Sequence, residues 1–143
     1  MTFKAFALGL AMASVATLSM AKPMTYTIDP THTATVFTWD HFGFSTPSGN
    51  FTDIQGKITV DNDKPEKSSV HVTIPLSSIN TNVKVLDDHL LKADFFDAEK
   101  YPTITFKSTK VETRDKKNYK ITGDLTIKGI TKPVVLDAVL NKQ

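Results

Sequence analysis

Cysteine is absent from this 143-residue chain, and several kinds of chemistry are excluded with it. Without thiols the chain can form no disulfide, no CxxC redox pair, no cysteine nucleophile and no covalent link to a c-type haem. A fold of this size must then be held together by burial of apolar side chains. Lys and Arg nearly balance Asp and Glu, 17 against 15, and they form no basic stripe, so the sequence predicts no nucleic-acid partner.

Motifs of the common enzyme classes are missing as well. The sequence contains no GxSxG, no P-loop and no GxGxxG, and the adjacent Asp87 and Asp88 lie on an expected helix, where their carboxylates point in different directions. No two of the four histidines have a metal-ligand spacing such as HExxH. We therefore expect no enzyme activity, no metal site and no cofactor, and histidines that are hydrogen-bonded within the fold.

The first 21 residues have the pattern of a secretory signal peptide. Lys4 precedes an apolar run over residues 5–18, and the small residues Ser19 and Ala21 stand at positions −3 and −1 of a cleavage site. The run is too short for a permanent membrane span. We expect cleavage after Ala21 and export to the periplasm, with a retained anchor as the alternative. Removing 21 of 143 residues leaves 122, enough for one domain over residues 22–143.

Alternation of apolar and polar residues dominates the rest of the chain and predicts strands with one buried and one wet face. Six strands are expected, over residues 33–42, 51–60, 69–76, 103–111, 119–127 and 133–140. The run Pro47-Ser48-Gly49-Asn50 predicts a turn after the first strand, and Gly56 predicts a bulge in the second.

One stretch breaks the alternation and predicts a short helix. Over residues 82–91 apolar residues recur at steps of three and four, with Thr81 or Asn82 as the expected N-cap. Sequential strands with a single helical connection predict an all-β fold, in which an antiparallel up-and-down sheet curls toward a barrel. Because the chain ends after the sixth strand, two unpaired edges are expected, and they favour pairing with a second copy as a homodimer.

Five blocks, in their order and spacing, carry a family resemblance. They are TYTIDPTHTATVFTWDHFGFS, GNFTDIQGKITVD, SSVHVTIPLSSINT, DDHLLKADFFDAEKYPTITFKSTKVE and YKITGDLTIKGITKPVVLDA, and they run from about Tyr26 to Val139. They resemble the YceI-like family. The resemblance implies an exported protein with a lipocalin-like, eight-stranded antiparallel β-barrel that binds polyisoprenoids and similar amphiphiles in its lumen. Family members continue past KPVVLDA into about two further strands, so we expect a C-terminally short domain with six of the eight strands.

The barrel interpretation gathers the inward-facing strand positions into one apolar wall. Its expected residues are Phe37, Trp39, Ile54, Ile58, Val72, Ile74, Ile104, Phe106, Leu125, Ile127, Val134 and Leu136. A lipid tail against such a wall gains roughly 0.8 kcal/mol per buried CH2 and needs no directional contacts. Alternation alone favours a solid core filled by side chains, because it indicates burial and not a cavity. The family resemblance favours the lumen.

The segment ADFFDAEKYP, residues 93–102, joins the expected helix to the next strand. Phe95 and Phe96 stand there between Asp94 and Asp97, which keep the joint at the water surface. We expect the two rings to seal one barrel end or to touch a bound tail, with an ordinary packing corner as the alternative. The further ligand contacts expected at this mouth are Leu90, His41 and Phe44, with His41 near the polar head group.

The sequence thus predicts an exported binding protein that holds a polyisoprenoid or another long-chain, fatty-acid-like ligand for carriage or sequestration. The alternative is a stress-response structural or interaction protein with a filled core, whose exposed edge strand recruits a partner. A co-purifying lipid distinguishes the two, because a filled core holds none.

Overall fold

The computed structural model describes residues 22–141, so the expected signal peptide lies outside the described residues. Within this range the chain forms nine strands, one α-helix and three single turns of 3-10 helix. The strands are β1 Met24–Thr27, β2 Thr35–Thr38, β3 Ser48–Phe51, β4 Gln55–Val60, β5 Ser69–Pro75, β6 Ile79–Asn80, β7 Thr103–Thr113, β8 Asn118–Ile127 and β9 Ile130–Val139. The helix α1 spans Lys84–Leu90, and the 3-10 turns span Pro30–His32, Pro65–Lys67 and Leu76–Ser78.

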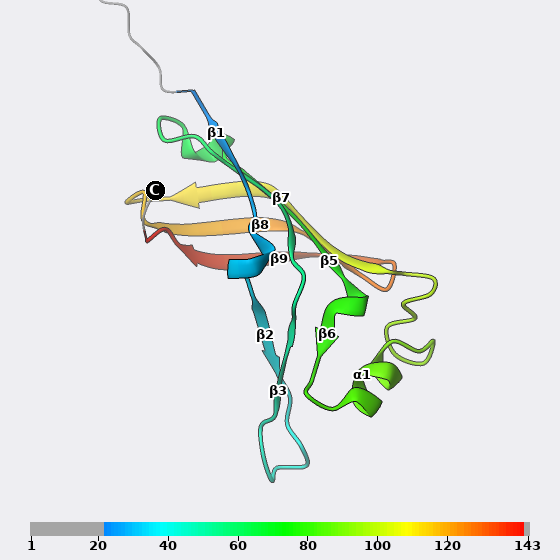
Figure 1. Ribbon diagram of the computed structural model, residues 1–143. Helices are drawn as coiled ribbons and strands as arrows, with labels where there is room; N and C mark the ends of the chain where they lie inside the picture. The colour runs from blue at the N-terminus through cyan, green and yellow to red at the C-terminus, as the bar shows by residue number, and fades with distance from the viewer. Residues whose placement is uncertain (1–21, 142–143) are drawn as a thin grey trace, which may run out of the picture.

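The strands form two antiparallel sheets, which confirms the mostly β, antiparallel prediction. The large sheet has the order β1-β4-β5-β7-β8-β9, and the small sheet has the order β2-β3-β6. In Figure 1 the long strands β7, β8 and β9 cross the upper part of the molecule, and the small sheet and α1 extend below them. In the described chain the two sheets do not close into a barrel, so β1 and β9 remain open edges of the large sheet.

The two faces of the large sheet differ in polarity. Directly opposed residues on one face are Val72, Phe106, Leu125 and Lys132. The adjacent row, on the other face, is His71, Lys107, Asp124 and Pro133. Since successive strand residues point to opposite faces, the apolar row continues along each strand. We call the face that carries Val72 and Phe106 the inner face.

The core lies where the inner face meets the small sheet and α1. Its buried residues are Phe51, Leu76, Ile79 and Ile104, and Leu76 is fully buried. Backbone bonds fix the 3-10 turn at its centre: the Leu76 amide donates to the Pro102 carbonyl (2.9 Å), and the Thr52 amide donates to the Ser78 carbonyl (2.9 Å). The turn thereby joins β3, β6 and the entry to β7.

The predicted first strand was too long, and the turn predicted at Pro47–Asn50 was wrong. The strand β2 ends at Thr38, and the chain reverses at residues 41–45, where the His41 amide donates to the Ser45 carbonyl (2.9 Å). The Asp40 carboxylate accepts from the Gly43 amide (3.0 Å), and such side-chain bonding stabilises a turn in place of a strand.

The predicted second strand is two strands, because the chain changes sheets inside it. Phe51 ends β3 in the small sheet, Gln55 begins β4 in the large sheet, and Ile54 between them turns into the core with 3% exposure. No bulge occurs at Gly56, whose register with β5 is regular; a Cβ there would collide with the His71 carbonyl. The bulge lies between Ser108 and Lys110. The short strands β1 and β6 were not predicted.

The helix prediction is confirmed, but its expected N-cap is wrong. Val83 occupies the N-cap and makes no side-chain capping bond. Instead Asp87, in the first turn, reaches back, and its carboxylate accepts from the Thr81 amide (2.8 Å) and hydroxyl (2.6 Å). No helix in residues 22–141 has the length and apolar character that a membrane crossing requires.

Candidate functional site

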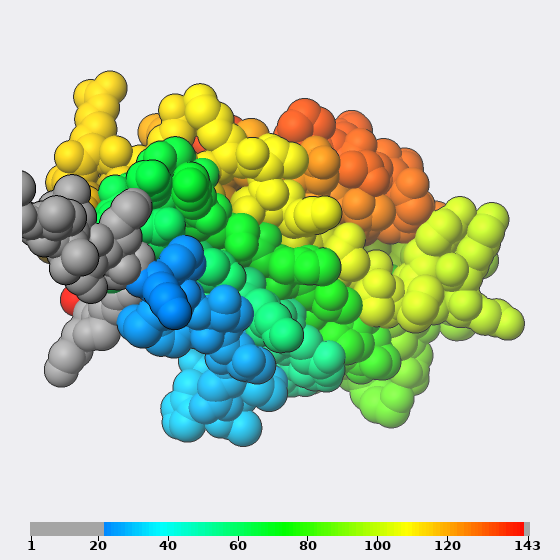
Figure 2. All heavy atoms as spheres, turned by 90° about the horizontal axis from the view of Figure 1, so that it is seen from above, coloured from blue at the N-terminus to red at the C-terminus, as the bar shows by residue number. Residues whose placement is uncertain are grey.

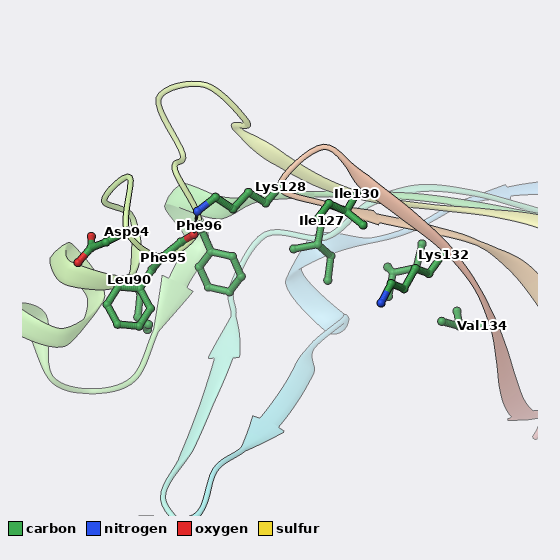
Figure 3. A pocket seen from close by; sticks show the side chains of 10 residues that line it. Leu90, Asp94, Phe95, Phe96, Ile127, Lys128, Ile130, Lys132 and Val134 are labelled. Atoms are coloured by element: carbon green, nitrogen blue, oxygen red, sulfur yellow. Dashed lines mark hydrogen bonds between the residues drawn. The ribbon is translucent and has the colours of Figure 1, made fainter.

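An apolar hollow of about 590 Å³ opens where the β8–β9 hairpin meets the segment that follows α1. We call it the hairpin hollow. The space-filling view shows the orange hairpin beside the yellow-green segment at one end of the molecule (Figure 2). The lining residues are Leu90, Asp94, Phe95, Phe96, Leu125, Ile127, Lys128, Ile130, Lys132 and Val134. In Figure 3 Phe95 and Phe96 lie on one side, and Ile130, Lys132 and Val134 lie on the other.

The hairpin wall is held in place by its two-residue turn. Lys128 and Gly129 both have left-handed backbone angles, with φ of 50° and 72°, which is the conformation of a type I′ turn. The Lys128 ammonium donates to the backbone carbonyls of Ala93 (2.9 Å) and Phe95 (2.6 Å). The turn also rests on Tyr101, since a Cβ at Gly129 would stand 2.6 Å from its ring. The hairpin tip is therefore tied to the opposite wall.

The opposite wall is a compact series of turns. The Phe96 amide donates to the Leu90 carbonyl (3.0 Å), and the Tyr101 amide donates to the Asp97 carbonyl (2.8 Å). These bonds satisfy backbone groups that a loop beside an apolar hollow would otherwise leave unpaired. Phe95 keeps 48% of its surface exposed, whereas Phe96 packs against the core. Phe95 thus lies at the rim of the hairpin hollow, and Phe96 forms its floor.

Asp94, the acidic residue of this wall, is hydrogen-bonded to His89. The His89 ring lies edge-on to the Phe95 ring, with centroids 4.8 Å apart, and its Nε2 stands 3.3 Å from the Asp94 carboxylate. The hydrogen bond with His89 lowers the pKa of the Asp94 carboxyl below its usual value. Asp94 is therefore an anion at the rim, held away from the apolar floor.

A second hollow, of about 250 Å³, adjoins the first beneath the small sheet. Its lining residues are Phe37, Trp39, Ile79, Thr81, Leu86, Leu90 and Phe96. Leu90 and Phe96 line both hollows, so the two spaces are neighbours along these side chains. A third hollow, of about 200 Å³, lies at the far end of the inner face, among Ile58, Val111, Tyr119 and Ile121.

The expected ligand-binding residues divide into three groups. Those that line the first two hollows are Phe37, Trp39, Leu90, Phe95, Phe96, Leu125 and Ile127. Those in the core, on the inner face or at the third hollow are Ile54, Ile58, Val72, Ile74, Ile104 and Phe106. His41 and Phe44 lie at the tip of the β2–β3 hairpin, where Phe44 is 88% exposed, and they line none of these hollows.

Sequence reasoning missed Ile130 and Lys132. Both occupy inner positions in the alternation Ile130, Lys132, Val134 of β9, but the last strand was predicted to begin at Pro133, so both fell in the expected turn. A lysine at an inner position of an alternating strand was the signal. Among residues 22–141 no three His, Asp or Glu side chains gather in a way that could hold a metal ion, so no metal ligand is assigned.

Comparison with known proteins identifies the family. The profile of the YceI-like domain matches residues 26–143. A UPF0312 protein of Photorhabdus laumondii is 44% identical over 104 residues, which are 73% of this chain and 54% of that relative, so the chain spans about half of that relative's length.

The structure of Burkholderia cenocepacia BcnA superposes with a TM-score of 0.70 at 25% identity, covering 77% of this chain and 68% of that one. A polyisoprenoid binding domain of Saccharophagus degradans superposes with a TM-score of 0.53 at 12% identity, covering 73% and 59%, a likeness of fold alone. The chain belongs to the YceI-like family.

Proposed function

We propose that this protein binds a long-chain amphiphile, such as a polyisoprenoid or a fatty-acid-like lipid, and carries or sequesters it without catalysis. One observation carries the proposal: the hairpin hollow is apolar and lies beside a core that is already complete. Its volume of about 590 Å³ is within the range of roughly 300–1,000 Å³ that is usual for small-molecule sites. A tail in this space would gain roughly 0.8 kcal/mol for each CH2 removed from water.

The adjoining hollow supports a long ligand over a short one. Leu90 and Phe96 line both spaces, and side chains can change rotamer without moving the backbone. A tail that begins in the hairpin hollow could then continue toward Phe37 and Trp39. The polyisoprenoid binding domain of Saccharophagus degradans has a related fold, and its ligand class has this chain-like form.

The alternative function, a structural or interaction protein with a filled core, accounts for one part of the molecule. Leu76, Ile79 and Ile104 form such a core. It does not account for Ile130, which lines the hairpin hollow on the inner side of β9 and remains 61% exposed. Apolar surface of this kind is stabilised by a cover, and the proposed ligand provides one.

Export to the periplasm is part of the proposal and rests on the pattern of residues 1–21. N-terminal sequencing of the protein from a periplasmic fraction should begin at Lys22, after cleavage following Ala21. Recovery of the intact N-terminus, Met1 or Thr2, would instead indicate a retained anchor.

The binding proposal is tested by organic extraction of the purified protein followed by mass spectrometry. We expect a long-chain lipid to co-purify, and less of it with Ile130→Gln, which places an amide in the hollow. Val85→Gln on α1 is the matched control, because Val85 is 80% exposed and lines none of the hollows. Absence of co-purified lipid, together with no binding of a fluorescent long-chain probe by the extracted protein, would contradict the proposal.

A further inference from the structure

The inner face of the large sheet carries one charged strand residue in the described chain, Lys132. The strand register places it opposite Leu125 on β8, in the same row as Phe106 and Val72. Other charged residues of these strands, such as Lys107 and Asp124, lie in the adjacent row on the outer face. Lys132 is exposed, so its ammonium keeps contact with water at the end of this apolar row. The inner face thus has one positive charge beside apolar side chains.

Lys132 is also unlike the other charged groups of the hairpin hollow. The Lys128 ammonium is engaged by two backbone carbonyls, and the Asp94 carboxylate is engaged by His89. Within residues 22–141 the Lys132 ammonium has neither a hydrogen bond nor an ion pair. In Figure 3 its side chain lies between Ile130 and Val134, along the wall of the hollow. The hollow thus presents one uncommitted positive charge.

We propose that Lys132 binds the anionic head group, a carboxylate or a phosphate, of the amphiphile whose tail occupies the hairpin hollow. This inference rests on the proposed function and narrows its ligand class from any long-chain lipid to an acidic one. The aliphatic stem of lysine continues the apolar wall, and the ammonium lies at its end. A hydrogen bond between two ionised groups is roughly twice as strong as one between neutral groups, and more so where water is partly excluded.

A different role for Lys132 makes a different prediction. Natural sheets protect an open edge with inward-pointing charges and with proline, and Lys132 stands beside Pro133 on the open edge β9. If protection of the edge were its whole role, its removal would promote self-association and leave ligand preference unchanged. The two roles are therefore separated by measuring both quantities on the same variant.

The test uses delipidated protein and two probes of equal chain length, dodecanoate and the uncharged dodecanol, titrated by calorimetry at neutral pH. We expect the wild type to prefer dodecanoate by about fivefold, a moderate value because Lys132 remains exposed. Lys132→Met should abolish the preference while dodecanol binds as before. Lys107→Met, which removes an ammonium from the outer face, should retain the preference. Acetate, which has the charge without the tail, should not compete at equal concentration.

The other outcomes of this titration refute either the role of Lys132 or the proposed function. Equal binding of the two probes by the wild type would refute the role of Lys132 and leave the proposed function standing. Binding of neither probe would refute the proposed function, and the inference with it. An unchanged preference in Lys132→Met, with new self-association in sedimentation, would assign the residue to protection of the edge.

Discussion

Replacing Phe96 by alanine should weaken ligand binding to an extent that its loss of stability does not explain. The ring of Phe96 lies between the hairpin hollow and the second hollow, and it is half-buried against the core. Truncation of a fully buried phenylalanine costs roughly 3–5 kcal/mol, so about 2 kcal/mol of unfolding free energy is expected for this half-buried ring. A tail that loses contact for about two methylenes loses roughly 1.6 kcal/mol, or about fifteenfold in affinity.

Leu76→Ala is the matched comparison. Leu76 is fully buried in the core and lines none of the hollows, so it should lose about 3 kcal/mol of stability, with affinity nearly unchanged under conditions where the variant is folded. Urea denaturation of delipidated protein gives the first quantity, and displacement of a fluorescent long-chain probe gives the second. If binding by both variants falls in proportion to stability, the contact between Phe96 and the ligand is refuted and the ring belongs to an ordinary packing corner.

Three further predictions concern the fold. Gly123→Ala should cost about 1–3 kcal/mol in urea denaturation, because the new Cβ would stand 2.6 Å from the Lys107 carbonyl oxygen; no loss would contradict this packing. The hydrogen bond from the Asn118 backbone amide lowers the pKa of the Asp115 carboxyl to about 2. The ionised carboxylate should therefore stabilise the fold fully above about pH 4, and this stabilisation should be lost toward pH 2. Carboxyl NMR titration measures this pKa. The open edge β9 predicts dimers in sedimentation at micromolar concentration, which Val135→Lys should dissociate; a wild-type monomer would contradict this.

The long strands were predictable because each has one wet face. Strands β5, β7 and β8 alternate in the sequence as they do in the sheet, and α1 follows the predicted helical spacing. Strand β1 could not be found this way, because all four of its residues are exposed. The segment Ser48–Phe51 has the residues of a turn, but Gly49 fits against the Phe37 ring of the neighbouring strand, a close approach that local sequence does not reveal.

The candidate site was predicted in part. Leu90, Phe95 and Phe96 were found because a change from helical to strand spacing marks a joint, and the structure places all three at the hairpin hollow. His41 was assigned by extending the alternation past Thr38, and Phe44 was placed beside it at the expected barrel mouth. The local bonding of Asp40 to the Gly43 amide ends that strand earlier, and carries both side chains away from the hollows.

The geometry of the hairpin hollow is set by the protein's own contacts. The Lys128 hydrogen bonds and the contact of Gly129 with the Tyr101 ring fix the hairpin tip against the opposite wall. Preorganised walls spare the ligand the entropy of ordering them, which raises affinity. Ile130 and Leu136 remain exposed on the inner side of the open edge β9, where burial of apolar surface is worth roughly 25 cal/mol per Å². If the proposed lipid tail covers this surface, a neighbouring chain cannot, so we expect added lipid to reduce any self-association.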